Sequence, residues 1–140
     1  MTVLSSRGLL DTSTVILLGR LTDPEVLPEE CLVSAVTLAE LSVGPHVART
    51  AKERTARQAH LQQAEADFQT VPFDAAAARA FGRVASALRS GGRKPAAHAY
   101  DALIAATAIA SDLDLYTCNP EDFVGIPELR VHPVPYPIDG

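Results

Sequence analysis

The apolar residues of this chain fall in short runs, separated by longer segments whose apolar positions recur with a helical period. Runs of four to six mostly apolar residues between turn signals are typical of buried strands. We therefore predict strands at residues 8–11, 31–36, 70–73, 113–117 and 129–134. Helices are predicted at residues 12–19, 37–47, 48–69, 74–89 and 96–111, with the break "SGGRKP" at 90–95 before the last of them.

Strands that alternate with helices indicate an α/β fold with a mostly parallel sheet. The chain has 140 residues, which suits one domain with one core. No repeat, linker or shift in composition divides it. We therefore expect a single domain that spans residues 1–140.

Polar side chains follow the predicted strands closely. Asp11 ends the first strand, and Glu40 lies in the first turn of the helix after the second. Asn119 and Asp122 follow the fourth strand directly, and Asp101 lies near the start of the helix before it. Because functional groups in parallel sheets gather at the carboxyl ends of the strands, we expect Asp11, Glu40, Asn119 and Asp122 on one edge. Asp101 is expected to join them.

Each of these residues also has a purely structural interpretation. Asp11 and Asp101 are suitable helix N-caps, and Asn119 resembles an N-cap followed by acids in the first turn. Thr37 and Glu40 match the capping box, S/T-x-x-E. Capping does not, however, require acids to converge on one edge. Convergent carboxylates repel one another, and a bound cation relieves that repulsion.

The expected ligands are hard oxygen donors, and no histidine accompanies them at a ligand spacing. This donor set favours Mg²⁺ or Mn²⁺ over zinc. A magnesium ion held by few carboxylates keeps open positions, which suit phosphate groups. Such an ion activates water and stabilises charge on phosphorus, so hydrolysis of a phosphodiester is the chemistry that the pattern favours.

Four segments in this order resemble the PIN domain, and in particular the VapC-type toxins of bacterial toxin–antitoxin pairs. They are "LLDTSTVI" at the start, "VTLAEL" at 36–41, "YDALIAATAIA" at 100–110 and "LYTCNPEDF" at 115–123. The resemblance implies a three-layer α/β/α sandwich around a parallel sheet of four or five strands. It also implies an endoribonuclease that depends on Mg²⁺ or Mn²⁺ and cuts cellular RNA.

The resemblance assigns roles to residues of this chain. By position, Asp11, Glu40 and Asp101 match the three acids of the family, and these three are the predicted metal ligands. Asn119 falls at the fourth acidic position, where it carries no charge, and Asp122 is a nearby acid. All five are candidate catalytic residues. The hydroxyls that we expect to support them from nearby are those of Thr12, Ser13 and Thr117.

The charge and composition bear on the partners. The net charge is −5, which does not favour nucleic-acid binding through the overall field, so any contact with RNA must be local. Arg93 and Lys94, in the loop before the Asp101 helix, are the RNA-binding candidates. The resemblance implies a homodimer neutralised by a VapB-type antitoxin, and the acidic balance is compatible with a basic partner.

The remaining features are interpreted more simply. The two cysteines show no zinc spacing and cannot build a disulfide framework, so we expect thiols in a reducing bacterial cytoplasm. The sequence shows no signal peptide, and its apolar runs are too short to span a membrane. The four histidines are interpreted as surface or structural residues, with a weak supporting role open to His98 beside Asp101.

Three alternatives remain open. A haloacid-dehalogenase-like phosphatase shares the strand-ending Asp, but needs a second Asp where this chain has Ser13. A receiver domain would need an acidic pair at the first strand and a late strand-ending lysine, which this chain lacks. A non-catalytic PIN scaffold that binds RNA or protein is the third, and the uncharged Asn119 is the feature that favours it.

Overall fold

The fold is described from a computed structural model, which covers residues 7–94 and 98–137. Within these residues, five parallel strands form one sheet with the order β3-β2-β1-β4-β5. The strands are β1 (Arg7–Leu10), β2 (Glu30–Ser34), β3 (Gln69–Val71), β4 (Asp114–Thr117) and β5 (Val131–Pro133). The predicted α/β fold with a parallel sheet is confirmed, and β1 lies at its centre.

The helices lie close to their predicted positions. They are α1 (Thr12–Leu17), α2 (Ala35–Val47), α3 (Ala51–Asp67), α4 (Ala75–Ser90) and α5 (Ala99–Ala110). Short 3₁₀ turns follow α1 at Leu18–Arg20, precede β2 at Pro24–Val26, and follow β4 at Pro120–Phe123. The start of the last predicted helix, at residues 96 and 97, lies outside the described residues.

Alternation along the strands divides the apolar core between the two faces of the sheet. Leu9, Leu32 and Leu115 belong to a buried cluster that includes residues of α4 and α5. Leu10 and Val33 belong to a second cluster, on the other face, with residues of α1, α2 and α3. Successive side chains of a strand point to opposite faces of the sheet. These strands carry apolar side chains on both faces, so helices cover the sheet on both sides and the fold is a three-layer sandwich.

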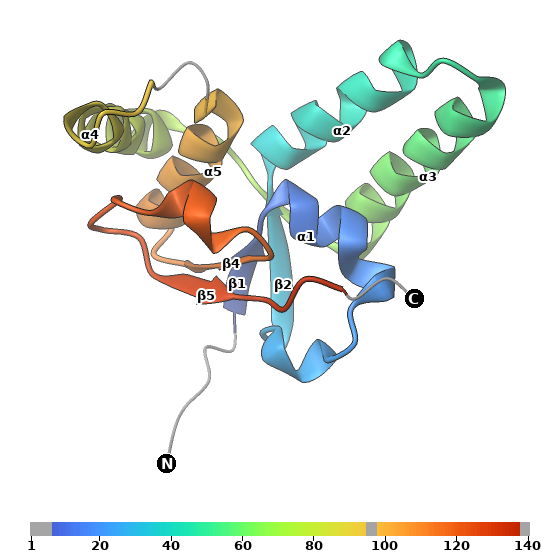
Figure 1. The fold of residues 1–140 in the computed structure, drawn as a ribbon, viewed down its shortest axis with the longest axis horizontal. Helices are drawn as coiled ribbons and strands as arrows, with labels where there is room; N and C mark the ends of the chain where they lie inside the picture. Colours follow the sequence, from blue (N-terminus) through green and yellow to red (C-terminus); the bar gives the residue numbers. More distant parts are fainter. Residues whose placement is uncertain (1–6, 95–97, 138–140) are drawn as a thin grey trace.

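Figure 1 shows how this arrangement shapes the molecule. The pair α2 and α3 projects to one side of the sheet and the pair α4 and α5 to the other, with α1 between them. α1 and α2 start directly after the carboxyl ends of β1 and β2, and the two helix pairs lie on either side of that edge of the sheet (Figure 1). This is the edge at which the candidate site lies.

The start of α2 differs from the prediction. The helix begins at Ala35, two residues earlier than expected, and the Ser34 hydroxyl caps it by accepting from the Val36 N–H at 3.0 Å. Thr37 is fully buried inside the first turn. The capping-box interpretation of Thr37 and Glu40 is therefore wrong. The apolar run "CLVSAV" hid the boundary, because a buried helix start and a buried strand share the same pattern.

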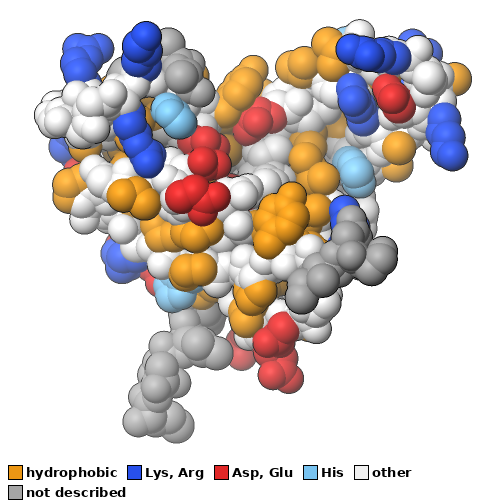
Figure 2. Space-filling model, in the orientation of Figure 1, with side chains coloured by type: hydrophobic (Ala, Val, Ile, Leu, Met, Phe, Trp, Pro, Cys, Tyr) orange, Lys and Arg blue, Asp and Glu red, His pale blue; other side chains and the backbone are white. Residues whose placement is uncertain are grey.

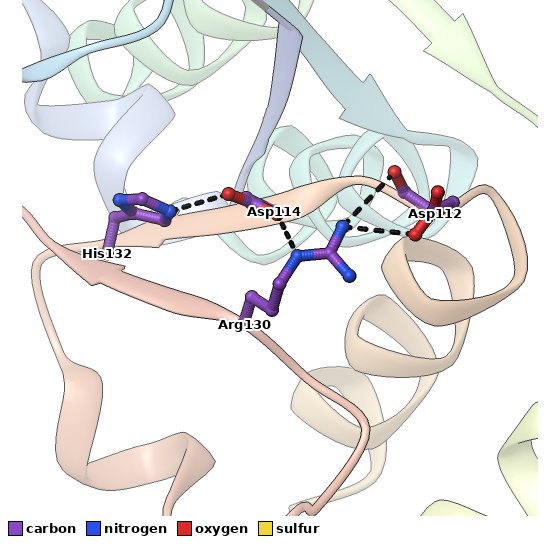
Figure 3. A network of polar contacts seen from close by, with 4 residues as sticks. All are labelled: Asp112, Asp114, Arg130 and His132. Atoms are coloured by element: carbon purple, nitrogen blue, oxygen red, sulfur yellow. Dashed lines mark hydrogen bonds and ion pairs between the residues drawn. The ribbon is translucent and has the colours of Figure 1, made fainter. Parts of the chain in front are cut away.

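The opposite edge of the sheet is tied together by a polar network (Figure 3). The Asp114 carboxylate accepts a hydrogen bond from Arg130 Nε and lies 2.7 Å from His132 Nε2, and Arg130 Nη2 donates to the Asp112 carboxylate at 3.1 Å. The His132 ring stacks on Tyr116 with centroids 4.5 Å apart. Burial raises the pKa of Asp114, but the bonds from Arg130 and His132 outweigh it and hold the pKa below its usual value. The network joins β5 to β4, so His132 has the structural role that we expected.

Candidate functional site

Asp11 is the most firmly held of the predicted site residues. It follows β1 directly, is 4% exposed, and caps α1 by accepting from the Thr14 N–H at 3.0 Å. Its carboxylate also accepts from the hydroxyls of Thr14 at 2.6 Å, Thr117 at 2.7 Å and Ser13 at 3.1 Å. Asp11 is thus a helix cap, and it is also a buried carboxylate fixed from two elements. The two interpretations of this residue are compatible.

Glu40 lies on α2, facing the start of α1. The Thr12 hydroxyl lies 2.6 Å from Glu40 Oε1 and 3.0 Å from the Thr37 hydroxyl. Burial raises the pKa of Glu40, the bond from Thr12 lowers it, and repulsion from Asp11 raises it further. The net effect is a raised pKa of Glu40. The contribution from Asp11 indicates that the two carboxylates lie close enough to repel each other.

Asp101 lies in the first turn of α5, and it does not cap that helix, because the N-cap position is His98. The cap interpretation of Asp101 is therefore wrong. Burial raises the pKa of Asp101 to about 6, and repulsion from Asp122, Glu40 and Asp11 contributes, while His98 lowers it. Within the described residues, the Asp101 carboxylate accepts no hydrogen bond that would offset this repulsion. Asp101 is therefore the carboxylate of the site on which the repulsion from the three others acts together.

Asn119 and Asp122 lie on the turn that follows β4. The Asn119 side chain does not cap the 3₁₀ turn. Instead, its Nδ2 donates to the Ser13 hydroxyl at 3.0 Å, and its backbone N–H donates to the Thr117 hydroxyl at 2.9 Å. Asn119 therefore occupies the N-cap position with acids in the first turn, as expected, but its side chain makes no capping hydrogen bond. The residue joins the hydroxyl cluster around Asp11, while Asp122 faces Asp101 closely enough to repel it.

Sequence reasoning missed Thr14. Its fully buried hydroxyl donates to Asp11 and accepts from the Cys118 N–H at 3.1 Å, so it links β4 to the start of α1. Its place, three residues after an N-cap aspartate, was the available signal, since the N–H at that position is the usual partner of the cap. Burial raises the pKa of the neighbouring Cys118 thiol.

The basic residues lie around the acidic site. Figure 2 shows carboxylates gathered in the hollow between the two helix pairs, and Lys and Arg side chains on both pairs. Of the two RNA-binding candidates, Lys94 is exposed. Arg93 is half-buried, and its guanidinium donates to the backbone carbonyls of Asp122 at 3.2 Å and Glu121 at 2.9 Å.

The donor set suits a hard divalent cation. The carboxylates of Asp11, Glu40 and Asp122 repel that of Asp101, and a bound divalent cation would relieve this repulsion. Among the described residues, no group of three or more acidic, histidine or cysteine side chains is arranged so that it could hold a metal ion. The two observations agree if few carboxylates bind the ion directly, because Mg²⁺ commonly retains several waters.

The parallel sheet, the helix order and the acids at its carboxyl edge define the class. Residues 9–128 match the PIN domain. The chain therefore belongs to the PIN-domain family, which replaces the phosphatase and receiver-domain alternatives. The described residues include no helix with the length and hydropathy needed to cross a membrane.

Within this family, the chain is similar to a known ribonuclease and to several solved structures. It is 36% identical over 128 residues to Ribonuclease VapC5 of Mycobacterium tuberculosis, covering 90% of this chain and 92% of that protein. A solved structure of VapBC-5, a toxin–antitoxin system of the same organism, matches with a TM-score of 0.76 and 33% identity over 92% of this chain and 99% of that one. FitAcB from Neisseria gonorrhoeae matches with a TM-score of 0.68 and 28% identity over 88% and 94% of the two chains.

Proposed function

We propose that this chain is a metal-dependent endoribonuclease of the VapC type, which acts as the toxin of a bacterial toxin–antitoxin pair in the cytoplasm. The similarity to Ribonuclease VapC5 over most of both chains supports ribonuclease activity. The observation that carries the proposal within the structure is the placement of Asp101 among Asp11, Glu40 and Asp122. Such repulsion between carboxylates destabilises a folded protein unless a bound cation relieves it, so it is typical of a functional site.

The proposed roles follow from the contacts. Asp11 and Asp101 would hold Mg²⁺ or Mn²⁺, with Glu40 in direct or water-mediated contact. Asn119 or Asp122 would complete the site or orient a water. When bound, the ion supplies the Lewis acidity that activates water toward phosphorus and stabilises the charge that develops there.

The hydroxyls around Asp11 have a definite task in this proposal. Thr14 and Thr117 donate to its carboxylate from α1 and β4. Ser13 also donates to it, and the Ser13 hydroxyl in turn accepts a hydrogen bond from Asn119 Nδ2. Groups that orient a ligating carboxylate in this way fix its direction before the ion binds. Glu40 receives the same support from Thr12.

The partners are proposed on the same basis. A VapB-type antitoxin is the expected inhibitor, because the similar VapBC-5 structure is of a toxin–antitoxin system. A homodimer is also proposed. A cationic antitoxin side chain placed among the carboxylates would form strong, charge-assisted hydrogen bonds. Lys94 is proposed to contact the RNA backbone from the rim of the site.

Asp101→Asn tests the proposed activity. Purified chain, free of antitoxin, is incubated with total RNA and either Mg²⁺ or EDTA. We expect cleavage with Mg²⁺ alone, and a rate at least 100-fold lower for Asp101→Asn, which corresponds to roughly 2.7 kcal/mol. The variant should fold, because its uncharged amide removes the repulsion at this position.

Asp67→Asn is the matched control, since Asp67 is an exposed aspartate at the end of α3. It should cleave like the wild type. If the wild-type chain cuts no RNA, or if Asp101→Asn cuts as fast as Asp67→Asn, the nuclease proposal fails. A non-catalytic PIN scaffold that binds RNA or protein would then be the better interpretation, consistent with the uncharged Asn119.

A further inference from the structure

Arg93 connects the end of α4 to the turn that carries Asn119 and Asp122. It follows Gly92, whose φ of +81° closes the C-terminus of α4. The Arg93 N–H donates to the Leu88 carbonyl at 2.9 Å, the long bond of a Schellman motif. The backbone of Arg93 is therefore fixed, and its side chain leaves α4 in a defined direction.

The guanidinium of Arg93 meets a short helical turn that has few bonds of its own. The carbonyls at the end of any helical turn lack partners within the helix. Here Arg93 Nη1 donates to the Asp122 carbonyl at 3.2 Å and Nη2 donates to the Glu121 carbonyl at 2.9 Å. Two consecutive carbonyls are thus held by one planar group, across 28 and 29 residues of sequence.

The position of this turn decides where Asp122 lies. Asp122 follows Asn119 by three residues, and its N–H donates to the Asn119 carbonyl at 3.0 Å. Asn119 is in turn bonded to Ser13 and Thr117 beside Asp11. The beginning of the turn is therefore anchored to the buried hydroxyl cluster, and its end is anchored to Arg93.

We propose that Arg93 is a positioning residue of the candidate site: by holding the carbonyls of Glu121 and Asp122, it keeps the Asp122 carboxylate beside Asp101. This inference rests on the proposed function, because it gives Asp122 a part in the metal site. It differs from the expectation that Arg93 binds RNA, since the same guanidinium N–H groups are directed at the protein's own backbone. Lysine has no planar fork and would hold the turn less well.

Binding of Mn²⁺ alone, without RNA, tests the inference. Isothermal titration of the full chain compares the wild type with Arg93→Ala, Arg93→Lys and the control Arg83→Ala. We expect Arg93→Ala to weaken Mn²⁺ binding about tenfold, the low end for loss of a group that orients a metal ligand, and Arg93→Lys to weaken it less. Arg83 is a suitable control because its guanidinium also makes two hydrogen bonds, to Glu128, on the exposed side of α4. Arg83→Ala should bind Mn²⁺ like the wild type.

Hydrogen exchange gives a readout that is independent of metal and of activity. Amides of residues 121–123 should exchange faster in Arg93→Ala than in the wild type, while those of β1 should not change. If exchange in the turn is unchanged, or if Mn²⁺ affinity is unchanged in Arg93→Ala, the positioning role is wrong. If the wild-type chain itself does not bind Mn²⁺, the metal-dependent proposal and the positioning role both fail.

Kinetics separate the positioning role from RNA binding. Loss of positioning lowers kcat and leaves KM and the salt dependence unchanged. Loss of a phosphate contact raises KM and reduces the salt slope by about 1, and that result with unchanged Mn²⁺ affinity overturns the inference. If the wild type binds Mn²⁺ and cuts no RNA, the nuclease proposal fails, and the Mn²⁺ titration and exchange results still decide the role of Arg93.

Discussion

At the scale of single residues, the site is organised by hydroxyl groups. Asp11 accepts from three hydroxyls and one backbone amide. Asp101 accepts no hydrogen bond from the described residues, and its pKa is raised to about 6. The two carboxylates that are proposed to share one ion are therefore held by opposite means. One is fixed by donors before any ion arrives, and the other is left for the ion to stabilise.

Thr117→Val tests the support of Asp11. The Thr117 hydroxyl is fully buried, donates to Asp11 and accepts from the Asn119 N–H. Valine keeps the shape, removes one of the donors to Asp11 and leaves the partly buried Asn119 N–H without its partner, so we expect a loss of about 1–3 kcal/mol in the free energy of unfolding. RNA cleavage should fall at least about tenfold. Urea denaturation and cleavage rates measure the two effects.

Thr107→Val is the matched control for that prediction. Thr107 is equally buried, but its hydroxyl bonds to the Leu103 carbonyl within α5 and lies 3.3 Å from the Ser34 hydroxyl. We expect some loss of stability and no loss of cleavage. Equal losses of cleavage in the two valine variants would mean that Thr117 acts only through stability.

At the scale of elements, the sequence predicted the strands beside the site well because each of them ends at or just before a polar residue: Asp11 follows β1, Ser34 ends β2 and Thr117 ends β4. Asp11 and Asn119 marked two strand ends, and both side chains bond to the Ser13 hydroxyl, while Asp11 and Glu40 are among the carboxylates that repel Asp101. The start of α2 was misplaced because Val36 continues an apolar run across the boundary. Burial on both sides removes the periodicity by which a strand and a helix are told apart.

The contacts between distant elements could not be predicted in this way. Nothing local in the sequence indicates that Arg93 meets the carbonyls of Glu121 and Asp122, or that Thr14 bridges Asp11 and Cys118. Such contacts depend on how α4, α1 and β4 are placed by the whole core. A residue's type restricts what it can donate or accept, and only the tertiary fold selects its partner.

Gly8→Ala tests how tightly β1 is packed in the centre of the sheet. A Cβ at Gly8 would clash with the Tyr116 ring, lying 2.7 Å from its Cδ1, and would lie 2.9 Å from Pro28 Cγ. The ring is buried and stacked on His132, so it cannot move away easily. We expect a loss of about 1–3 kcal/mol in the free energy of unfolding, as for other overpacked cores.

Gly82→Ala provides the contrast within the same chain. A Cβ at Gly82, in the middle of α4, would meet no atom within 4 Å. Alanine favours a helix over glycine, so this substitution should increase stability by up to about 1 kcal/mol. Urea denaturation should therefore show a lower free energy of unfolding for Gly8→Ala and a higher one for Gly82→Ala than for the wild type. The same sign for both would mean that the Tyr116 ring yields to the added methyl group.

At the scale of the whole molecule, charge is distributed unevenly. The net charge is −5, and carboxylates gather in the hollow between the two helix pairs while basic side chains lie on the pairs themselves (Figure 2). A polyanionic substrate would be attracted by the basic pairs and repelled by the acidic hollow unless a cation occupied it. The proposed ion would therefore serve substrate binding as well as chemistry.

Asp101→Asn should also make the folded chain more stable in the absence of divalent ions. The pKa of Asp101 is about 6 when folded and about 3.9 in an unfolded chain. Because the folded pKa is the higher one, this group favours folding fully below about pH 4, and that contribution is lost as the pH rises through about 6. We expect the variant to exceed the wild type by on the order of 1–2 kcal/mol at pH 8, after allowance for partial solvent screening.

Urea denaturation at pH 5 and pH 8, in EDTA, measures that difference. The advantage of the variant should grow with pH, and Mn²⁺ should stabilise the wild type more than the variant. Glu65→Gln, at an exposed position of α3, should show no such trend. If Asp101→Asn were more stable than the wild type by the same amount at both pH values, the raised pKa of Asp101 would be contradicted.

The bond between Asp11 and Thr117 spans 106 residues of sequence, as does the bond between Ser13 and Asn119. A ribosome that has made the first half of this chain has therefore made half of the site and none of its hydroxyl support from β4. The carboxylates of Asp101 and Asp122 also arrive late in synthesis. A nuclease assembled in this order would gain its complete site only late in synthesis, so the proposed toxin would meet its proposed inhibitor as a nearly finished protein.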